Sequence, residues 1–228
     1  MPSISENIYN VKARIEQAAR RAGRDPSEIK LVAATKDVPA NLIVEAINSG
    51  ITDIGENRVQ EAETKFEALK SYPVTWHMIG HLQTNKVAPA LKIFSVFQSV
   101  DSERLALEIS KKTDKPIDVY IEVNTSGEAS KFGISPDRTL ELARSITGLN
   151  NLNLIGLMTI GPLTKDADKT RESFRLLKKL FDQIKELNLP RALLKYLSMG
   201  MSGDFEVAVE EGATIVRLGT VLFGARGT

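Results

Sequence analysis

The sequence lacks cysteine altogether and has only two histidines among its 228 residues. The missing thiols exclude disulfide frameworks, thiolate nucleophiles, cysteine-bound zinc and iron–sulfur clusters, and they fit a reducing compartment. An excess of one charge is also lacking, because 30 Lys and Arg stand against 29 Asp and Glu, a net charge of +1. Proteins that bind nucleic acid or an anionic membrane surface usually carry excess positive charge, so we expect neither partner.

Long apolar runs are absent as well. A notable uncharged stretch, residues 147–164, is interrupted by Asn, Gly and Pro and does not have the character of a membrane span. The amino terminus has polar and acidic residues early and no apolar core of a secretory signal. The composition, 42% hydrophobic and 26% charged, is that of an ordinary globular protein. We therefore expect a cytoplasmic protein in which residues 1–228 form a single domain.

The sequence does have a regular alternation of short apolar segments and amphipathic stretches. Ser3 and Glu6 form a capping-box pattern before apolar residues spaced by three and four, which predicts an opening helix that ends near Gly23. Apolar segments, each with a helical stretch after it, then predict buried parallel strands. The strands are expected at residues 30–35, 52–55, 75–79, 94–100, 117–123, 152–158, 196–198 and 215–218. The helices are expected at 41–49, 58–69, 86–92, 102–113, 136–146, 166–188 and 205–211.

Eight strand and helix units in a chain of this length favour the α/β class, as a (β/α)8 TIM-type barrel with an extra N-terminal helix. An open doubly wound sheet is the weaker interpretation, because no Gly-x-Gly-x-x-Gly follows the first predicted strand. In a barrel, active sites lie at the carboxyl ends of the strands, and the loops after strands seven and eight often hold phosphate. We therefore expect functional residues at these positions.

Lys36 directly follows the first predicted strand, and strand alternation places it on the same side as Val32 and Ala34. If that side is the barrel interior, Lys36 projects into the open end of the barrel. Partial desolvation there disfavours the ammonium form and makes a neutral amine available to attack an aldehyde. A solvated lysine at a strand end is the alternative.

Two loops with glycines stand where a barrel phosphate site is expected. The loop after the seventh strand, residues 199–204, contains two glycines and the hydroxyl of Ser202, and Gly219 and Thr220 follow the eighth strand. Backbone N–H groups and hydroxyls in such loops can bind an anion. Two ordinary tight turns are the alternative.

Arg217 and Asn57 are further candidates at the same end of the barrel. Arg217 shares the side of Ile215 on the eighth strand and should face the interior, where it needs a carboxylate or a ligand acceptor. An internal ion pair would satisfy it equally. Asn57 follows the second strand and is either the N-cap of a helix that begins at Arg58 or a ligand contact.

His77 and His81 are four residues apart, a metal-binding spacing only on a helix, whereas this segment is predicted as a strand that enters a loop. We expect packing and hydrogen bonding from them, and no metal site. Several methionines also fall near predicted strand ends, as walls for a flat ligand or as core filling. They are Met78, Met158, Met199 and Met201.

Seven segments, in order along nearly the whole chain, carry a family resemblance. They are LVAATK, GENRVQE, WHMIGHLQTNK, VNTSGEASKFG, GLMTIGP, LSMGMSGD and VRLGTVLFGAR. With these segments the sequence closely resembles the pyridoxal 5'-phosphate (PLP) homeostasis protein family, PLP-binding barrels similar to the N-terminal domain of alanine racemase.

The resemblance implies a Schiff base between Lys36 and PLP, with Arg217 near the pyridine nitrogen. It also implies contacts to the phosphate and around the ring. The phosphate contacts are Ser202 and the backbone of Gly219 and Thr220, and the positions near the cofactor are Asn57 and Met201. An arginine beside the ring nitrogen keeps that nitrogen unprotonated, so the cofactor becomes a weaker electron sink.

Alanine racemases carry a second, β-rich domain whose tyrosine acts as a base, whereas this sequence stops at Thr228, ten residues past Leu218. None of its four tyrosines lies at the carboxyl end of a predicted strand. The resemblance therefore favours a monomeric PLP carrier or buffer without catalysis, with PLP-dependent apo-enzymes as recipients. The alternatives are a weak PLP-dependent amino-acid racemase that uses His77, His81 or a partner-chain residue as base, and an aldolase-like barrel that uses Lys36 on a phosphorylated carbonyl substrate.

Overall fold

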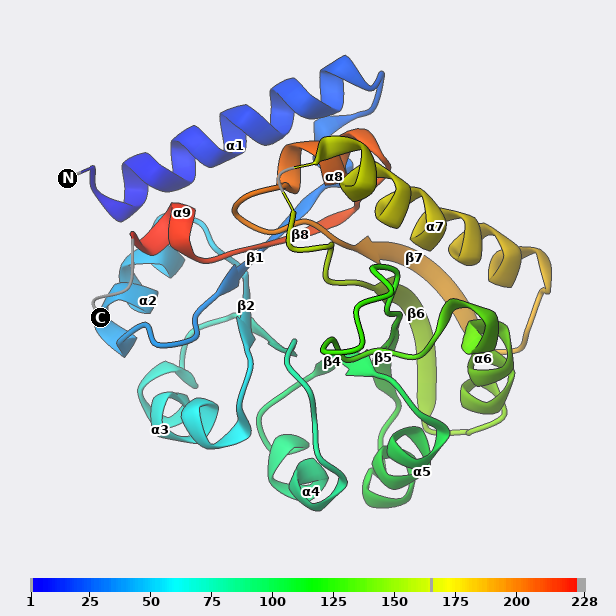
Figure 1. The fold of residues 1–228 in the computed structure, drawn as a ribbon. Coiled ribbons are helices and arrows are strands. Elements are labelled where there is room, and N and C mark those ends of the chain that lie inside the picture. The colour runs from blue at the N-terminus through cyan, green and yellow to red at the C-terminus, as the bar shows by residue number, and fades with distance from the viewer. Residues whose placement is uncertain (1, 165, 225–228) are drawn as a thin grey trace.

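The computed structural model describes residues 2–164 and 166–224. In this part of the chain, eight parallel strands form a closed barrel in which each strand pairs with the next (Figure 1). They are β1 (Lys30–Ala34), β2 (Asp53–Glu56), β3 (Thr75–Met78), β4 (Val96–Val100), β5 (Ile117–Glu122), β6 (Leu152–Met158), β7 (Ala192–Ser198) and β8 (Ile215–Leu218). The barrel closes where β1 pairs with β8, with Ala33 opposite Leu218. The predicted (β/α)8 barrel is confirmed.

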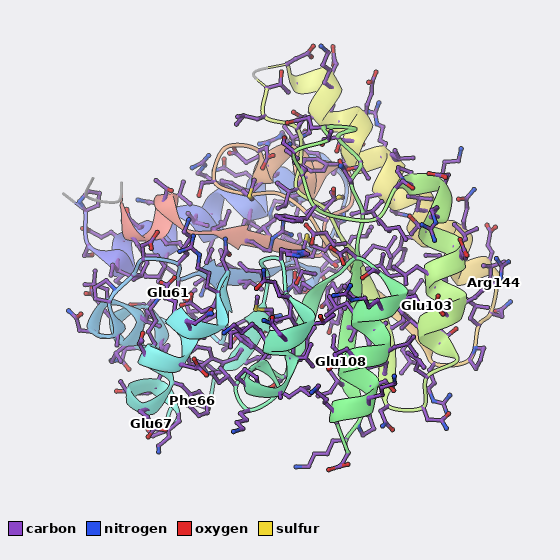
Figure 2. The ribbon with its side chains drawn as sticks, turned by 60° about the horizontal axis from the view of Figure 1, so that its bottom comes forward. Glu61, Phe66, Glu67, Glu103, Glu108 and Arg144 are labelled. Carbon is purple, nitrogen blue, oxygen red and sulfur yellow. The ribbon has the colours of Figure 1, made fainter. Side chains whose placement is uncertain are left out.

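Helices surround the barrel (Figure 1). They are α1 (Ile4–Arg21), α2 (Ala40–Asn48), α3 (Val59–Leu69), α4 (Val87–Ala90), α5 (Glu103–Lys112), α6 (Thr139–Thr147), α7 (Ala167–Glu186), α8 (Phe205–Glu210) and α9 (Thr220–Phe223). Short 3-10 turns precede β1, α4 and α6, at Pro26–Glu28, Thr84–Lys86 and Pro136–Arg138. Figure 2 labels charged side chains on the surface of α3 and α6, among them the exposed Glu67 and Arg144. No helix of the described residues is long and apolar enough to cross a membrane.

The extra helix α1 packs across α8 and α9 on the outside of the barrel (Figure 1). Its first turn carries the predicted capping box, in which Ser3 Oγ accepts from the Glu6 N–H at 3.2 Å and Glu6 Oε2 accepts from the Ser3 N–H at 2.7 Å. Its apolar stripe, which includes Ile4, Ile8 and Val11, is buried. The predicted opening helix is therefore confirmed, with its cap.

The barrel interior contains a small apolar cluster, separate from the larger core between strands and helices. It consists of Val32, Val96, Tyr120, Ile155, Met158 and Ile215. Side chains two residues apart on a strand share a face, so Arg217 and Glu122 follow Ile215 and Tyr120 into the same interior. The prediction that Arg217 faces the barrel interior is confirmed.

The strand boundaries agree with the prediction to within two residues, except for the seventh. β7 begins at Ala192, four residues before the predicted start at Tyr196. Leu193 and Lys195 are exposed while Leu194 is buried, so one face of this half of the strand is in contact with solvent. The prediction assumed a continuous apolar segment, so it did not include the first half of β7.

Candidate functional site

The predicted site residues lie at the mouth of the barrel, meaning the carboxyl ends of the strands and the loops that follow them. Lys36 lies in the turn after β1, and its side chain is 34% exposed. Its Nζ is 3.9 Å from Asp37 Oδ2. Asp37 has a left-handed backbone with a φ of 58°, so the chain turns sharply just after Lys36.

The backbone before Lys36 is held by a buried lysine from α3. Lys65 Nζ donates to the Thr35 carbonyl oxygen at 2.7 Å and to Glu56 Oε1 at 2.8 Å. The Thr35 hydroxyl donates to the same Glu56 oxygen at 2.7 Å. Burial raises the pKa of Glu56, against the hydrogen bonds from Lys65 and Thr35.

The backbone after Lys36 is held by the same lysine through Glu61. Lys65 Nζ donates to Glu61 Oε1 at 2.6 Å, and that oxygen accepts from the Asp37 N–H at 2.5 Å. Glu61 lies at the start of α3 (Figure 2). Sequence reasoning missed this support cluster of Glu56, Glu61 and Lys65, although the four-residue spacing from Glu61 to Lys65 on a predicted helix was a visible signal.

The loops after β7 and β8 meet beside β1. Ser202 Oγ accepts from the Val221 N–H at 3.4 Å, at the first turn of α9, where N–H groups have no partner within the helix. A Cβ on Gly219 would lie 3.1 Å from the carbonyl oxygen of Ala34. The structure therefore brings Ser202, Gly219 and Thr220 to the end of the strand that leads into Lys36.

Met201 lies in the loop after β7 and is exposed, with 37% of its surface accessible. Its N–H donates to Asp204 Oδ1 at 2.6 Å, which ties the loop to the start of α8. Burial raises the pKa of Asp204, and this hydrogen bond opposes the shift. Gly200, just before, has a φ of 94° and packs so closely against Ala208 that a Cβ there would lie 2.5 Å from the Ala208 Cβ.

Arg217 is buried inside the barrel, with 4% of its surface exposed. Its Nη1 donates to Ser198 Oγ at 2.7 Å and its Nη2 to the Thr159 carbonyl oxygen at 2.8 Å. Across residues 2–164 and 166–224, no carboxylate forms an ion pair with it, so the internal ion pair considered above is not found. Burial lowers the pKa of Arg217 to about 10, against the charges of Glu122 and Asp204.

Glu122, at the end of β5, is a buried carboxyl group that sequence reasoning missed. It is 3% exposed, and its Oε2 has no hydrogen-bond partner among the described residues. Burial raises its pKa to about 7, helped by the charge of Asp101 and opposed by that of Arg217. The available signal was a carboxylate at the inward position of an apolar strand, two residues after Tyr120.

Asn57 follows β2, but it does not cap α3. That helix begins at Val59, its N-cap is Arg58 in an extended conformation, and no side chain caps it. The N-cap interpretation is therefore wrong, because the chain stays extended for one residue longer than expected. Asn57 instead lines a cavity of about 440 Å³ with Met78 and other side chains from the loop after β3.

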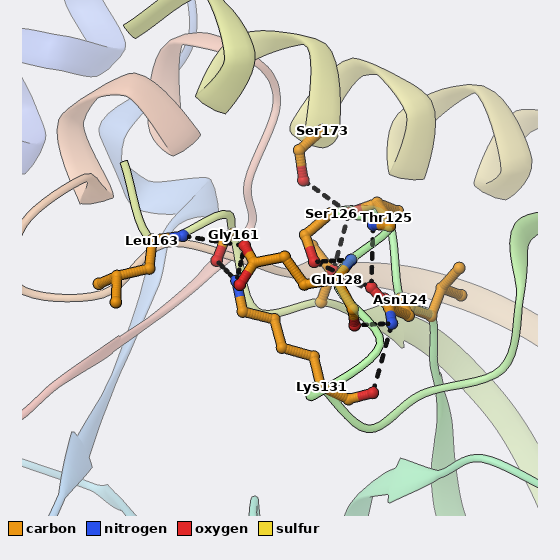
Figure 3. Close-up of polar contacts among 11 residues, drawn as sticks. Asn124, Thr125, Ser126, Glu128, Lys131, Gly161, Leu163 and Ser173 are labelled. Atoms are coloured by element: carbon orange, nitrogen blue, oxygen red, sulfur yellow. Dashed lines mark hydrogen bonds and ion pairs between the residues drawn. The ribbon is translucent and has the colours of Figure 1, made fainter. Parts of the chain in front are cut away.

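The loop after β5 is held by hydrogen bonds within itself and to the loop after β6 (Figure 3). Lys131 Nζ donates to Glu128 Oε1 at 2.8 Å and to the Gly161 carbonyl oxygen at 2.7 Å. The same Glu128 oxygen accepts from the Leu163 N–H at 3.2 Å, so this loop is tied to the loop after β6. Asn124 closes its base by donating to the carbonyl oxygen of Glu128 at 2.9 Å.

His77 forms hydrogen bonds and His81 packs against an aromatic ring, in line with the prediction. His81 lies at the mouth, where it stacks on Phe132 with ring centroids 4.0 Å apart and faces Asp101. His77 is buried in the barrel and lies 2.9 Å from both Asp53 and Gln98. The described residues contain no group of three or more metal-binding side chains. Of the four candidate methionines, Met78, Met158 and Met199 are buried, and Met201 is exposed. Met78 lines the cavity beside Asn57, so both Met78 and Met201 fit a ligand wall.

Comparison with known proteins gives full-length matches. The family described as "Alanine racemase, N-terminal domain" matches residues 7–227. A pyridoxal phosphate homeostasis protein of Aquifex aeolicus is 46% identical over 225 residues, which cover 97% of each chain. Its counterpart in Escherichia coli is 38% identical over 232 residues, covering 99% of this chain and 98% of that one.

Solved structures agree with these matches. PipY of Synechococcus elongatus, solved with PLP bound, superposes with a TM-score of 0.85 at 32% identity, covering 97% of this chain and all of PipY. The alanine racemase of Corynebacterium glutamicum shares the fold at 14% identity, with a TM-score of 0.73. The match covers 99% of this chain but 61% of the racemase.

Proposed function

Since the chain belongs to the alanine racemase N-terminal domain family, and within it to the pyridoxal phosphate homeostasis proteins, we propose that it binds PLP at the mouth of its barrel and acts in PLP homeostasis. One observation carries the proposal. The half-buried amine of Lys36 lies just after β1, and the end of β1 packs closely against Gly219. Next to Gly219, the Ser202 hydroxyl accepts a hydrogen bond from the first turn of α9.

The residues present fit the chemistry of PLP, which has an aldehyde, a phosphate and a ring nitrogen. Lys36 offers an amine that is partly accessible. Ser202, Gly219 and Thr220 offer a hydroxyl and first-turn N–H groups suited to a phosphate. Arg217 offers guanidinium N–H groups and has no ion-pair partner among the described residues, so it can donate to an unprotonated ring nitrogen.

Each of these residues then has a separate role. When bound, PLP supplies a carbonyl group and a conjugated ring. Lys36 would hold the carbonyl carbon through a covalent bond to Nζ, with the carbonyl oxygen released as water, and the support cluster of Glu56, Glu61 and Lys65 fixes the backbone on both sides of Lys36. Arg217 binds at the ring nitrogen as a donor that does not transfer its proton, which favours storage of the cofactor over carbanion chemistry. Asn57 and Met201 contact the cofactor from the loops after β2 and β7.

The test is reduction of PLP-loaded protein with borohydride, followed by peptide mass spectrometry. We expect a phosphopyridoxyl group on Lys36 and a visible absorption band that Lys36→Ala abolishes. Lys30→Ala is the matched control, because Lys30 lies at the opposite end of β1. Modification of another lysine, or an unchanged band in Lys36→Ala, would refute the attachment site.

We further propose that the protein passes PLP to apo-enzymes that require it. The partial exposure of the Lys36 side chain supports this, because water and an incoming amine can reach it. A stopped-flow assay would follow activation of an apo-aminotransferase by the loaded protein, with alkaline phosphatase present to destroy free PLP. Activation that persists under these conditions indicates direct transfer, whereas its complete loss indicates release into solution and contradicts the proposal.

A cytoplasmic location and a monomeric state stay predictions. Light scattering coupled to size-exclusion chromatography tests the second, since a chain of 25.1 kDa gives a mass clearly different from that of a dimer.

A further inference from the structure

A row of polar side chains crosses the interior of the barrel beneath the mouth. It runs through strands β2, β3, β4, β7 and β8, and its members are Asp53, His77, Gln98, Ser198 and Arg217. All five residues are buried, and the Asp53 side chain is the most accessible of them, with 12% of it exposed. The separations are 2.9 Å from Asp53 to His77, 2.9 Å from His77 to Gln98, 2.6 Å from Gln98 to Ser198 and 2.7 Å from Ser198 to Arg217.

The chemistry of Arg217 sets the direction of the first bonds in this row. A guanidinium only donates, so Ser198 Oγ must accept from Arg217. The Ser198 hydrogen is then directed to Gln98 Oε1. With its oxygen used in this way, the Gln98 amide faces His77 with its NH₂ group and donates to His77 Nδ1.

The remaining bonds follow from the state of His77. Because Nδ1 accepts, the single ring proton of a neutral His77 is on Nε2, which donates to Asp53 Oδ1. Burial works against an ionised Asp53, but the hydrogen bonds from His77 and Thr52 together hold its pKa below the ordinary value. Every donor in the row therefore points from the cation of Arg217 toward the anion of Asp53.

The reverse orientation of the Gln98 amide is disfavoured because it leaves donors and acceptors of the row without partners. Its NH₂ group would face Ser198 Oγ, which would then receive two donors while its own hydrogen lost Gln98 as acceptor. The Gln98 oxygen would then face His77 and would need a proton on His77 Nδ1. His77 would have to be charged, or its unprotonated Nε2 would have to accept a hydrogen bond from a protonated Asp53. Buried groups that lose a partner in this way destabilise the structure.

We infer that Asp53, His77, Gln98 and Ser198 are positioning residues that hold the guanidinium of Arg217 in a single orientation toward the ligand at the mouth. The inference rests on the proposed function, which supplies the ligand. Arg217 is oriented by two oxygens, those of Ser198 and Thr159, and neither is a carboxylate that would compete with a ligand acceptor. The anion that aligns the row, Asp53, lies on the far side of three uncharged groups.

The row also extends toward the opposite end of the barrel. Asp53 is the first residue of β2 and lines a cavity of about 470 Å³ beside α1, together with Lys12 and Lys30. Arg217, by contrast, lies near the carboxyl end of β8. A substitution at Asp53 therefore reaches Arg217 through the row and not by direct contact with a ligand at the mouth.

The first test measures the tautomer of His77 by 15N NMR of the ligand-free protein at mildly alkaline pH. The chain has two histidines, so His81→Gln leaves one set of ring signals to assign. We expect a neutral ring with its proton on Nε2. A proton on Nδ1, or on both nitrogens, would overturn the inference, and this measurement needs no change within the row.

The second test compares Asp53→Asn with Asp118→Asn, a control carboxylate on β5 that binds Asn153 outside the row. An uncharged Asn can donate to His77 Nε2 as well as accept from it, which removes the cost of the second tautomer at this end of the row but leaves the cost at Ser198. We therefore expect Asp53→Asn to gain a minor fraction of the second His77 tautomer while the control keeps one. In PLP titrations followed by absorbance, we expect roughly tenfold weaker binding for Asp53→Asn, the loss of about one hydrogen bond, and a displaced absorption maximum. A PLP affinity and spectrum equal to those of the control would overturn the positioning role. Absence of PLP binding by the unsubstituted protein would instead refute the proposed function and leave the tautomer result standing.

Discussion

Lys36 is held in place by residues that do not face the ligand. Lys65 joins the Thr35 carbonyl group to Glu56 and Glu61, and Glu61 in turn accepts from the N–H that follows Lys36. A flexible amine at a barrel mouth would sample many positions, and a fixed backbone reduces their number. The support cluster thus limits where the Lys36 side chain begins, which favours the proposed attachment of PLP.

Lys65→Met should destabilise the protein and weaken PLP attachment. The substitution leaves Glu56 buried without its cationic partner, and breaking a buried pair costs about 3 kcal/mol in the free energy of unfolding. Urea denaturation measures this loss. Lys70→Met removes an exposed pair with Glu67 at the C-terminal end of α3 and should cost less than about 1 kcal/mol. Equal losses in the two variants would contradict the role of Lys65.

Glu122→Gln should stabilise the ligand-free protein at alkaline pH. Burial raises the pKa of Glu122 from 4.5 to about 7, so the folded state binds a proton that the unfolded state releases. The stability from the protonated form is complete below pH 4.5 and is lost as the pH rises through about 7. Above that pH the ionised carboxylate costs roughly 3 kcal/mol, which glutamine avoids.

Urea denaturation of both proteins at acidic and alkaline pH measures this effect. The free energies of unfolding should nearly coincide at pH 4, diverge as the pH rises from 4.5 to about 7, and stay apart by a constant amount above that, with the variant more stable. A constant difference across the pH range would show that Glu122 does not hold a proton in the folded state.

The position of a single residue was predictable where the alternation of side chains along one strand determines which way it points. Alternation from Ile215 was sufficient to place Arg217 in the interior. Glu122 follows the same rule, but it was overlooked because its strand was interpreted as an apolar segment. The cluster around Lys65 could not be derived in full, because its bond to the Thr35 carbonyl oxygen depends on the packing of α3 against β1 and β2.

At the scale of elements, the loop after β7 depends on a glycine with an unusual backbone. Gly200 has a φ of 94°, and a Cβ there would lie 2.5 Å from the Ala208 Cβ and 3.0 Å from the Phe205 Cα. The loop can therefore turn from β7 into α8 only if this residue has no side chain. The same loop carries Ser202 to α9.

Gly200→Ala should lower stability and weaken PLP binding together. Left-handed strain and the clash with α8 predict a loss of about 3 kcal/mol in the free energy of unfolding. Gly203→Ala is the matched control in the same loop, because a Cβ there meets nothing within 4 Å. Denaturation and PLP titration of both variants decide the matter, and a control that loses as much as Gly200→Ala would rule out the steric explanation.

Element types and order were predictable from hydrophobic period, whereas several boundaries were not. The start of α3 shifted because Arg58 stays extended, and β7 started earlier because its first half is partly solvent-exposed. Both depend on packing against neighbours, which a period of apolar residues does not report. The capping box of α1, by contrast, is local and was predicted with its bonds.

At the scale of the whole molecule, the closed barrel brings residues from opposite ends of the sequence together. Pairing of β1 with β8 puts Gly219 against Ala34, so the amine after β1 and the loop after β8 share one edge of the mouth. Counting strands was enough to predict this meeting. The polar row from Asp53 to Arg217 was not predictable, because it depends on which interior positions of β2, β3, β4 and β7 lie at the same height.

Ligand binding at this edge should stabilise the whole barrel, because the proposed PLP site exists only where β1, β7 and β8 are folded together. At a PLP concentration 100 times the Kd, linkage adds about 2.7 kcal/mol to the free energy of unfolding, which raises the Tm of a protein of this size by roughly 5–10 °C. Scanning calorimetry would measure the rise. Pyridoxine 5'-phosphate, which has the phosphate but no aldehyde, should give a smaller rise that is equal for the unsubstituted protein and Lys36→Ala. An equal rise for PLP in both proteins would mean that the covalent bond to Lys36 contributes nothing, and the phosphate loops alone would account for binding.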